Sequence, residues 1–316
     1  MSDVALGVDV GGTKSLALVL GADGRVVGES RVASCAESAE ALVSVVAGQV
    51  RQLCAAHDLD VATTPLGVGL AGMVTFEGRF AYSPHLAGAS GAHVSHALRD
   101  VLGREGLVVD NDANLAALAE GRWGAARGES HYLMVTLGTG IGGGIVAQGQ
   151  LVRGAHGFAG EVGHMSVVAG GDECVCGGRG CWERYVSGDA LTRRAREAVL
   201  AGRAPELARR YGESLTSEDV AAGADEHVVE ALDLLEEMGW WFAVGLANLV
   251  AVLDVSYVVV GGGLSALSHH LLPATRRHLG EMLEGRGARG EVTVREAQLG
   301  PRAGAIGAAL AARGGR

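Results

Sequence analysis

Residues 4–20 read VALGVDVGGTKSLALVL, in which two apolar runs flank the polar turn DVGGTK at residues 9–14. Short apolar runs separated by a glycine-rich turn are typical of two antiparallel strands. A second turn, GADG at residues 21–24, precedes a third expected strand at 25–32. The sequence therefore predicts that the chain opens with an antiparallel meander of three strands.

The same arrangement returns in the middle of the chain. An apolar run at 132–137 leads into the glycine-rich segment GTGIGGG at 138–144, and another apolar stretch follows at 145–147. A supersecondary unit that occurs twice indicates an internal repeat. We therefore expect two related domains, with a boundary near residue 121 that rests on the repeat alone.

Strands and helices alternate through the rest of the sequence, which is the pattern of an α/β fold. We expect further strands at 65–70, 107–109 and 255–260, and helices at 39–57, 93–102, 111–123, 188–201, 226–253 and 303–313.

Composition restricts the class of protein. The chain has 316 residues, of which 48% are hydrophobic and 20% charged, as in ordinary globular proteins. The net charge is −10 without a basic cluster, so nucleic acid is not an expected partner. We see no signal peptide and no apolar tract long enough for a bilayer, and therefore expect a cytoplasmic protein without a membrane partner. An odd number of cysteines, 5, argues against a disulfide framework.

Two glycine-rich turns are candidate phosphate sites. The turn at 9–14 offers backbone N–H groups, a hydroxyl and a cation, and Asp9 at the strand end could hold a hydrated Mg²⁺. Taken alone, a hairpin turn without a ligand explains this stretch equally well. The segment at 138–144 is a second backbone nest, with the hydroxyl of Thr139. Two such nests on repeated units favour a nucleotide that is bound between two domains.

A polar cluster follows the strand expected at 107–109. Residues 110–114 read DNDAN and begin a helix, so capping explains at least one of these side chains. Four polar side chains exceed what a cap needs. In phosphoryl transfer, a carboxylate aimed at the acceptor hydroxyl can take its proton as the new bond forms. Asp112 is the candidate for this base.

One histidine and three cysteines form a candidate zinc site: His164, Cys174, Cys176 and Cys181. The ligand types and their number match a tetrahedral structural zinc, although the C-x-C spacing differs from the commoner finger patterns. A closed set of four ligands leaves no position for an activated water, so the metal would fix the loop. Unliganded thiols in a loop are the alternative.

Two further features lie near ligand-binding motifs. Glu161 and Glu183 flank the cysteine loop, and carboxylates accept hydrogen bonds from vicinal hydroxyls such as those of a sugar; ordinary surface charges are the alternative. Three glycines at 261–263 close an expected strand, where doubly wound proteins bring backbone close to a ligand, for which adenosine is the candidate here. A plain strand-to-helix turn explains those glycines equally well.

Taken together, these segments resemble the ROK family of sugar kinases and sugar-responsive repressors, most closely its bacterial ATP-dependent glucokinases. The resemblance rests on residues 9–14, 111–114, 138–144, 160–164, 174–183 and 260–263. The family has an actin-like, ribonuclease-H-like fold of two domains, with a final helix that packs on the N-terminal domain. The resemblance implies an N-terminal α/β domain at 1–120 joined by the C-terminal helix 303–316, and a C-terminal α/β domain at 121–302 with a zinc loop at 164–181. It also implies a homodimer.

The resemblance implies ATP-dependent phosphorylation of the 6-hydroxyl of glucose, a step of glycolysis, with Mg²⁺ and a structural Zn²⁺. Asp112 would be the general base. The implied sugar-binding residues are Gly72, Asn111, Asp112, Glu161, His164 and Glu183. The implied ATP and phosphate ligands are Asp9, Gly11, Gly12, Thr13, Lys14, Gly138, Thr139, Gly140 and Gly262. The implied zinc ligands are His164, Cys174, Cys176 and Cys181.

One departure from the family pattern bears on the choice of sugar. Residues 83–86 read SPHL, where many family members have Pro-Asn-Leu and use the amide to bind sugar. His85 therefore leaves other acceptors open, such as N-acetylmannosamine, fructose or another hexose, and polyphosphate stays open as a donor. A non-catalytic sugar-responsive regulator is the alternative class. It needs a basic helix-turn-helix module, for which the three residues before the first strand leave no room.

Overall fold

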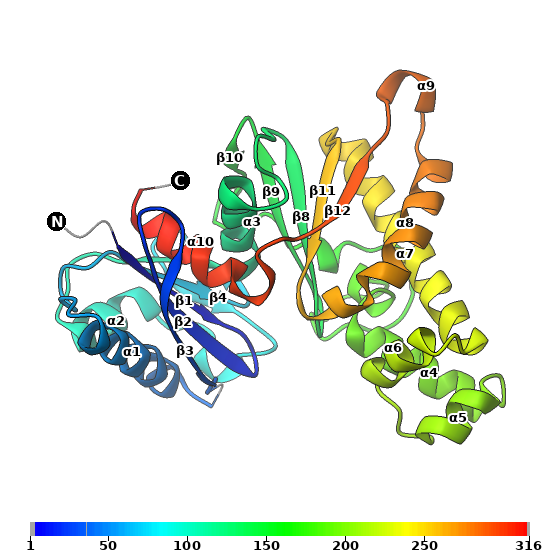
Figure 1. The fold of residues 1–316 in the computed structure, drawn as a ribbon, viewed down its shortest axis with the longest axis horizontal. Helices are drawn as coiled ribbons and strands as arrows, with labels where there is room; N and C mark the ends of the chain where they lie inside the picture. Colours follow the sequence, from blue (N-terminus) through cyan, green and yellow to red (C-terminus); the bar gives the residue numbers. More distant parts are fainter. Residues whose placement is uncertain (1–3, 36, 315–316) are drawn as a thin grey trace. The chain divides into compact units, whose positions relative to one another are not determined.

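The computed structural model describes residues 4–35 and 37–314. The chain forms two compact units, and the first is larger than the N-terminal domain expected from the sequence because it also takes in residues 121–130 and 144–160 (Figure 1). Unit 1 contains Met1–Ser130, Gly144–Gly160 and Gln298–Arg316, and unit 2 contains His131–Gly143 and Glu161–Ala297. Among the described residues, no helix combines the length and hydropathy needed to cross a membrane.

The first sheet has the strand order β3-β2-β1-β4-β7. Its opening strands form the antiparallel meander that the sequence predicts, and two further strands run parallel to β1. The strands are β1 (Ala5–Val10), β2 (Lys14–Leu20), β3 (Val26–Ala33), β4 (Leu66–Leu70) and β7 (Val108–Asn111). Every residue of β4 is buried, as expected for a parallel strand with both faces covered.

Helices cover both faces of this sheet (Figure 1). Because side chains alternate along a strand, Leu6 and Val8 of β1 pack with α1 (Ala39–Ala56) and α2 (Val94–Leu102). Ala5 of the same strand packs in a second cluster, with α3 (Asp112–Trp123) and α10 (Ala303–Ala312). A short hairpin of β5 (Met73–Val74) and β6 (Phe80–Tyr82) and the 3₁₀ turn η1 (Ala87–Ala89) complete this region.

The final helix α10 packs against the sheet at backbone distance. A Cβ atom added at Gly67 of β4 would lie 2.0 Å from the carbonyl oxygen of Ala308, and one at Gly7 of β1 would lie 1.9 Å from that of Ala305. Backbone atoms of a packed helix cannot move aside as a flexible side chain can. Glycine at these positions is therefore what allows α10 to lie directly on β1 and β4.

We expect Gly67→Ala to lower the free energy of unfolding by about 1–3 kcal/mol, because overpacking forces backbone shifts. Gly48→Ala is the matched control: it lies in α1, where an added Cβ has no neighbour within 4 Å in the described part of the chain. That change should stabilise the protein by about 0.4–1 kcal/mol. Urea denaturation measures both, and equal midpoints for Gly67→Ala and the wild type would contradict the close packing.

The second sheet repeats the strand order of the first. Its order is β10-β9-β8-β11-β12, with β10 antiparallel to β9, and with β11 parallel to both β8 and β12. The strands are β8 (Tyr132–Leu137), β9 (Ile141–Ala147), β10 (Gln150–Leu151), β11 (Tyr257–Gly261) and β12 (Thr293–Glu296). The internal repeat is thus confirmed by topology. One boundary was wrong: β9 begins at Ile141, inside the segment expected to be a turn.

Most of the described helices lie in unit 2. The sequence predicts α4 and α7, but not the shorter α5 and α6, nor α8. The elements are α4 (Gly188–Leu200), α5 (Pro205–Tyr211), α6 (Ser217–Asp225), α7 (Val229–Leu253), α8 (Ser268–Met282), α9 (Arg286–Arg289) and the 3₁₀ turns η2 (Val162–His164), η3 (Trp182–Arg184), η4 (Gly263–Leu267) and, in unit 1, η5 (Gly300–Arg302).

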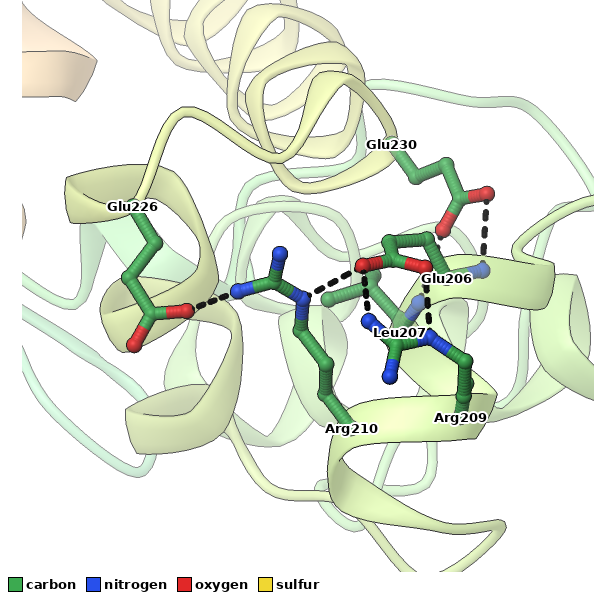
Figure 2. Close-up of polar contacts among 6 residues, drawn as sticks. All are labelled: Glu206, Leu207, Arg209, Arg210, Glu226 and Glu230. Atoms are coloured by element: carbon green, nitrogen blue, oxygen red, sulfur yellow. Dashed lines mark hydrogen bonds and ion pairs between the residues drawn. The ribbon is translucent and has the colours of Figure 1, made fainter.

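Carboxylates and arginines connect α5 to its neighbours (Figure 2). Glu230 at the start of α7 accepts the backbone N–H groups of Glu206 and Leu207, at 3.1 and 2.9 Å, in the first turn of α5. Arg210 bridges Glu206 and Glu226. Hydrogen bonds from Arg209 and Arg210 lower the pKa of Glu206 to about 2. The N-terminus of this short helix is therefore satisfied by a carboxylate from another helix.

Candidate active site

The predicted phosphate turn closes the β1–β2 hairpin. The N–H of Gly11 donates to the carbonyl of Lys14 at 3.0 Å, so the turn is tight, and the side chains of Thr13 and Lys14 are exposed. A pocket in unit 1 opens beside it, with about 590 Å³ of empty space that is partly open to solvent. Its lining includes Asp9, Gly11, Thr13, Lys14, Ser15, Leu16, Arg31, Asp112 and Pro301. The structure thus brings several predicted phosphate residues together with the predicted base.

Asp9 is one of the residues that line this pocket. Its carboxylate packs against α10, where a Cβ atom on Gly304 would come within 2.5 Å of Oδ2. Burial raises the pKa of Asp9 to about 6, because the charged form loses hydration. The group is therefore mainly ionised at neutral pH, and a cation would stabilise its charge. A hard oxygen ligand of this kind suits Mg²⁺.

Asn111 and Asp112 are placed by the start of α3. Asn111 is the N-cap residue: its Oδ1 accepts the N–H of Asn114 at 3.0 Å, and its Nδ2 donates to the carbonyl of Gly72 at 3.0 Å. Asp112 follows as the first helical residue, with Oδ1 accepting the N–H of Ala113 at 2.9 Å. The predicted sugar residues of unit 1, Gly72, Asn111 and Asp112, are therefore neighbours.

A part-buried ion pair lies next to this cluster. Asp110 is 7% exposed, and its Oδ2 accepts from Nε and Nη2 of Arg153 at 2.9 and 2.8 Å. Its Oδ1 accepts the N–H of Asn111 at 2.8 Å. Sequence reasoning singled out the DNDAN segment but missed Arg153, because a pairing across 43 residues leaves no local pattern. The pair fixes the backbone that presents Asn111 and Asp112.

The loop that departs from the family pattern lies beside the phosphate turn. His85 is exposed, and a Cβ atom on Gly12 would lie 3.1 Å from the Cβ of His85. Ser83 anchors the loop: its Oγ donates to the carbonyl of Ala71 at 2.7 Å and accepts the N–H of His85 at 3.1 Å. His85 is therefore held next to Gly12, and its loop is anchored at Ala71, the residue before Gly72.

In unit 2, the four predicted zinc ligands lie together. Their ligand atoms are all within 4.8 Å of one another, with His164 Nδ1 3.7 Å from the sulfur of Cys174 and the sulfurs of Cys176 and Cys181 3.6 Å apart. Tetrahedral Zn–S bonds of about 2.3 Å place two sulfurs about 3.8 Å apart. The cluster is therefore close to the geometry that zinc requires, and far from that of a disulfide.

The two glutamates lie with the cysteine loop. Glu183 Oε1 is 3.5 Å from His164 Nδ1 and accepts a hydrogen bond from the Cys174 thiol at 3.0 Å. Burial raises the pKa of Glu161. The nearby charge of Glu183 raises this pKa further, and that of His164 lowers it. Glu161, His164 and Glu183 therefore form one acceptor-rich cluster in unit 2.

A buried tryptophan fixes the end of this loop. Trp182 is fully buried, donates from Nε1 to the carbonyl of Trp241 at 2.9 Å, and stacks on Phe242 with ring centroids 5.4 Å apart. It thereby attaches η3, which carries Glu183, to the long helix α7. No local pattern pairs Trp182 with α7, so sequence reasoning missed this contact.

The glycine segments of unit 2 also converge. Gly138 accepts the N–H of Gly188, the first residue of α4, at 2.8 Å. Gly262 has φ +94°, and a Cβ atom there would lie 2.3 Å from the carbonyl oxygen of Leu137, so this position requires glycine. A Cβ atom added at Gly188 would lie 3.5 Å from Oγ of Ser217, at the start of α6. Gly262 thus lies next to the start of the glycine-rich turn at 138–144.

The fold is α/β with two sheets of one strand order, and unit 1 has a glycine-rich turn and carboxylates around one pocket, which are the groups that a phosphoryl-transfer enzyme requires. The family model described as "ROK family" matches residues 5–314, and the chain belongs to the ROK family.

Individual relatives agree in length as well as in sequence. A glucokinase of Streptomyces coelicolor is 35% identical over 98% of both chains, and an N-acetyl-D-glucosamine kinase of Citrobacter koseri is 34% identical over 85% of this chain and 91% of its own. The solved structure of a ROK family glucokinase from Streptomyces griseus, in complex with glucose and AMPPNP, superposes with a TM-score of 0.88 at 35% identity, covering 98% of this chain and 99% of that one. The α/β sugar-kinase fold predicted from the sequence is thereby confirmed.

Proposed function

We propose that this protein is a glucokinase that transfers the γ-phosphoryl group of ATP to the 6-hydroxyl of glucose. The full-length similarity to glucokinases supports this activity. The observation that carries it in this chain is the pocket of unit 1, where Asp112 shares one hollow with Asp9, Thr13 and Lys14. A base and phosphate-binding groups in one pocket are what phosphoryl transfer to a hydroxyl needs. We propose an actin-like architecture, because the two sheets share one strand order.

In unit 1, Asp112 accepts the proton of the sugar hydroxyl as the phosphoryl group is transferred. Asn111 has its Oδ1 and one N–H engaged, and its second Nδ2–H can donate to the sugar. Asp9 would hold Mg²⁺, and the N–H groups of Gly11 and Gly12, with Thr13 and Lys14, would bind phosphate oxygens. When bound, Mg²⁺ neutralises phosphate charge.

In unit 2, we assign Glu161, His164 and Glu183 to the sugar hydroxyls. If His164 Nδ1 binds zinc beside Cys174, Cys176 and Cys181, its Nε2 is left to contact the substrate. Zinc would supply a rigid loop and no catalytic chemistry, since four protein ligands close its coordination shell. We assign Gly138, Thr139 and Gly140 to phosphates and Gly262 to adenosine.

A coupled ADP-release assay with Mg-ATP tests the proposed reaction. The panel is glucose, N-acetylmannosamine, N-acetylglucosamine, mannose and fructose, and we expect glucose to lead in kcat/KM by about tenfold or more. If another sugar leads, the protein is still a kinase but its acceptor is not glucose. His85, which stands where many relatives have asparagine, would then be the residue expected to set the sugar preference. Absence of turnover with every sugar, with both ATP and polyphosphate, would refute the kinase.

Cys176→Ser tests the zinc loop. We expect the purified variant to lose its zinc and its KM for glucose to rise by about tenfold or more, because Glu183 and His164 depend on the loop. Cys35→Ser is the matched control, since Cys35 is a free cysteine outside the cluster. Elemental analysis and steady-state kinetics measure both effects. Full zinc content with an unchanged KM would contradict the assignment.

A further inference from the structure

We propose that Asp225, His269 and His270 form a second transition-metal site, separate from the cysteine loop. Asp225 is the last residue of α6, and the two histidines lie in the first turn of α8. Nε2 of His269 and Nε2 of His270 each lie 2.9 Å from Oδ1 of Asp225. Two nitrogen donors and one carboxylate oxygen are a ligand set that Zn²⁺, Ni²⁺, Co²⁺ and Cu²⁺ accept.

The arrangement of the rings is unusual for neighbours on a helix. Consecutive residues of an α-helix project about 100° apart, so two adjacent side chains normally point to different surroundings. Here both imidazoles turn to the same oxygen, with ring centroids 4.0 Å apart. All three ligand atoms lie within 4.8 Å of one another. In a tetrahedral site with bonds of about 2.1 Å, ligand atoms are about 3.4 Å apart, so small side-chain rotations would admit an ion.

The environment of the cluster suits an accessible ion. The side chains of Asp225 and His269 are 59% and 60% exposed, whereas that of His270 is 16% exposed. Three protein ligands leave a position for water, in contrast to the closed set of the cysteine loop. The ligand set also contains no sulfur, which makes the two sites distinguishable by spectroscopy.

A metal here would fasten the end of α6 to the start of α8. η4 lies immediately before α8 and follows Gly262, and α6 begins at Ser217 beside Gly188. The ion would therefore cross-link α6 and α8, the two helices whose neighbouring segments contain Gly188 and Gly262. Because binding favours the folded state, saturating metal raises the melting temperature.

The test is a calorimetric titration with Ni²⁺ of the full-length protein that carries one equivalent of Zn²⁺, enough for the cysteine loop alone. We expect one further equivalent to bind to the wild type. His269→Ala, His270→Ala and Asp225→Asn should each weaken binding by about tenfold or more, the loss that even outer-shell partners cause. Asp225→Asn is the sharpest variant, because its amide oxygen can still accept hydrogen bonds from both histidines while the carboxylate ligand is lost.

The matched control is His278→Ala, in the same helix. His278 Nε2 lies 2.6 Å from Glu236 and its Nδ1 lies 3.6 Å from Glu281, so it is a histidine beside carboxylates without a second imidazole in the cluster. We expect this variant to bind Ni²⁺ like the wild type. Circular dichroism melts confirm that each variant is folded.

Three results would overturn the proposal. They are the absence of a further equivalent, binding that the three variants do not change, and binding that His278→Ala weakens to the same extent. Co²⁺ gives an independent readout. The second equivalent should show d–d bands without thiolate charge transfer, and a charge-transfer band on that equivalent would place the ion on the cysteines instead.

Discussion

Asp112→Asn should reduce kcat by about a hundredfold to ten-thousandfold and leave the affinity for glucose nearly unchanged. The amide cannot take the proton of the acceptor hydroxyl. Its oxygen can still accept the N–H of Ala113, as Asp112 Oδ1 does at 2.9 Å, so the start of α3 is preserved. Coupled kinetics give kcat, and calorimetry gives the glucose affinity.

Glu40→Gln is the matched control, because Glu40 is an acidic residue in the first turn of another helix, α1. It should turn over at the wild-type rate. Turnover by Asp112→Asn within about tenfold of the wild type would remove Asp112 from the role of base.

Asp9 is the competing carboxylate in the same pocket. Its pKa of about 6 is closer to neutrality than that of an ordinary aspartate, which is a property of general bases. Its carboxylate lies against Gly304 and lines the same pocket as Thr13 and Lys14 of the phosphate turn, which favours a metal ligand instead. Asp9→Asn should therefore raise the KM for Mg-ATP. If Asp9→Asn loses kcat at saturating Mg-ATP while Asp112→Asn keeps it, the two roles are exchanged.

Local pattern was sufficient for the first sheet, for β8 and β11 of the second sheet and for the polar turns, but not for the edge strands β10 and β12 or for the β5–β6 hairpin. The DVGGTK turn and the DNDAN segment combine strand ends with residues that leave the strand pattern, and both lie where expected. β9 was cut short because a run of glycines disfavours a strand by propensity alone. In the structure, Gly144 stays in the strand because α3 approaches it, with a Cβ position 2.7 Å from the Cβ of Ala117.

The contacts that sequence could not supply are non-local. The short polar helix α5 lacks an apolar stripe, and Glu230 of α7 accepts two backbone N–H groups of its first turn. Pro273 lies inside α8, and because proline is disfavoured in a helix interior, the sequence around it does not predict a helix. Arg153 and Asp110 pair across 43 residues, and no spacing rule connects them. Such partners follow from the folded topology and not from local propensity.

Glu120 is the most consequential of these non-local residues. It lies in α3 and is fully buried. Its Oε2 accepts the N–H groups of Ala125 and Gln298 at 2.7 and 3.1 Å, and its Oε1 accepts the N–H of Leu299 at 2.8 Å. Gln298 is the residue at which the chain re-enters unit 1 before α10. One carboxylate therefore fixes the loop after α3 and the segment that leads into the final helix.

Glu120→Ala should lower the free energy of unfolding by about 1–3 kcal/mol, because three part-buried backbone N–H groups lose their charged acceptor. Glu120→Gln should cost less, since the amide keeps one oxygen as an acceptor and turns an NH₂ group toward the other donors. Urea denaturation followed by tryptophan fluorescence measures the loss. Such a loss is a large share of the stability of an ordinary domain.

The control is Glu129→Ala, an exposed glutamate in the loop after α3, which should change stability by less than about 0.5 kcal/mol. Because Glu120 does not line the pocket of Asp112, the folded fraction of the Glu120 variants should keep a kcat close to that of the wild type. Kinetics at a temperature where the variants are folded separate the two effects. A Glu120→Ala protein as stable as the wild type would mean that water replaces the carboxylate at the three backbone donors, and that the packing of α10 on β1, β4 and α3 is enough to hold the final helix.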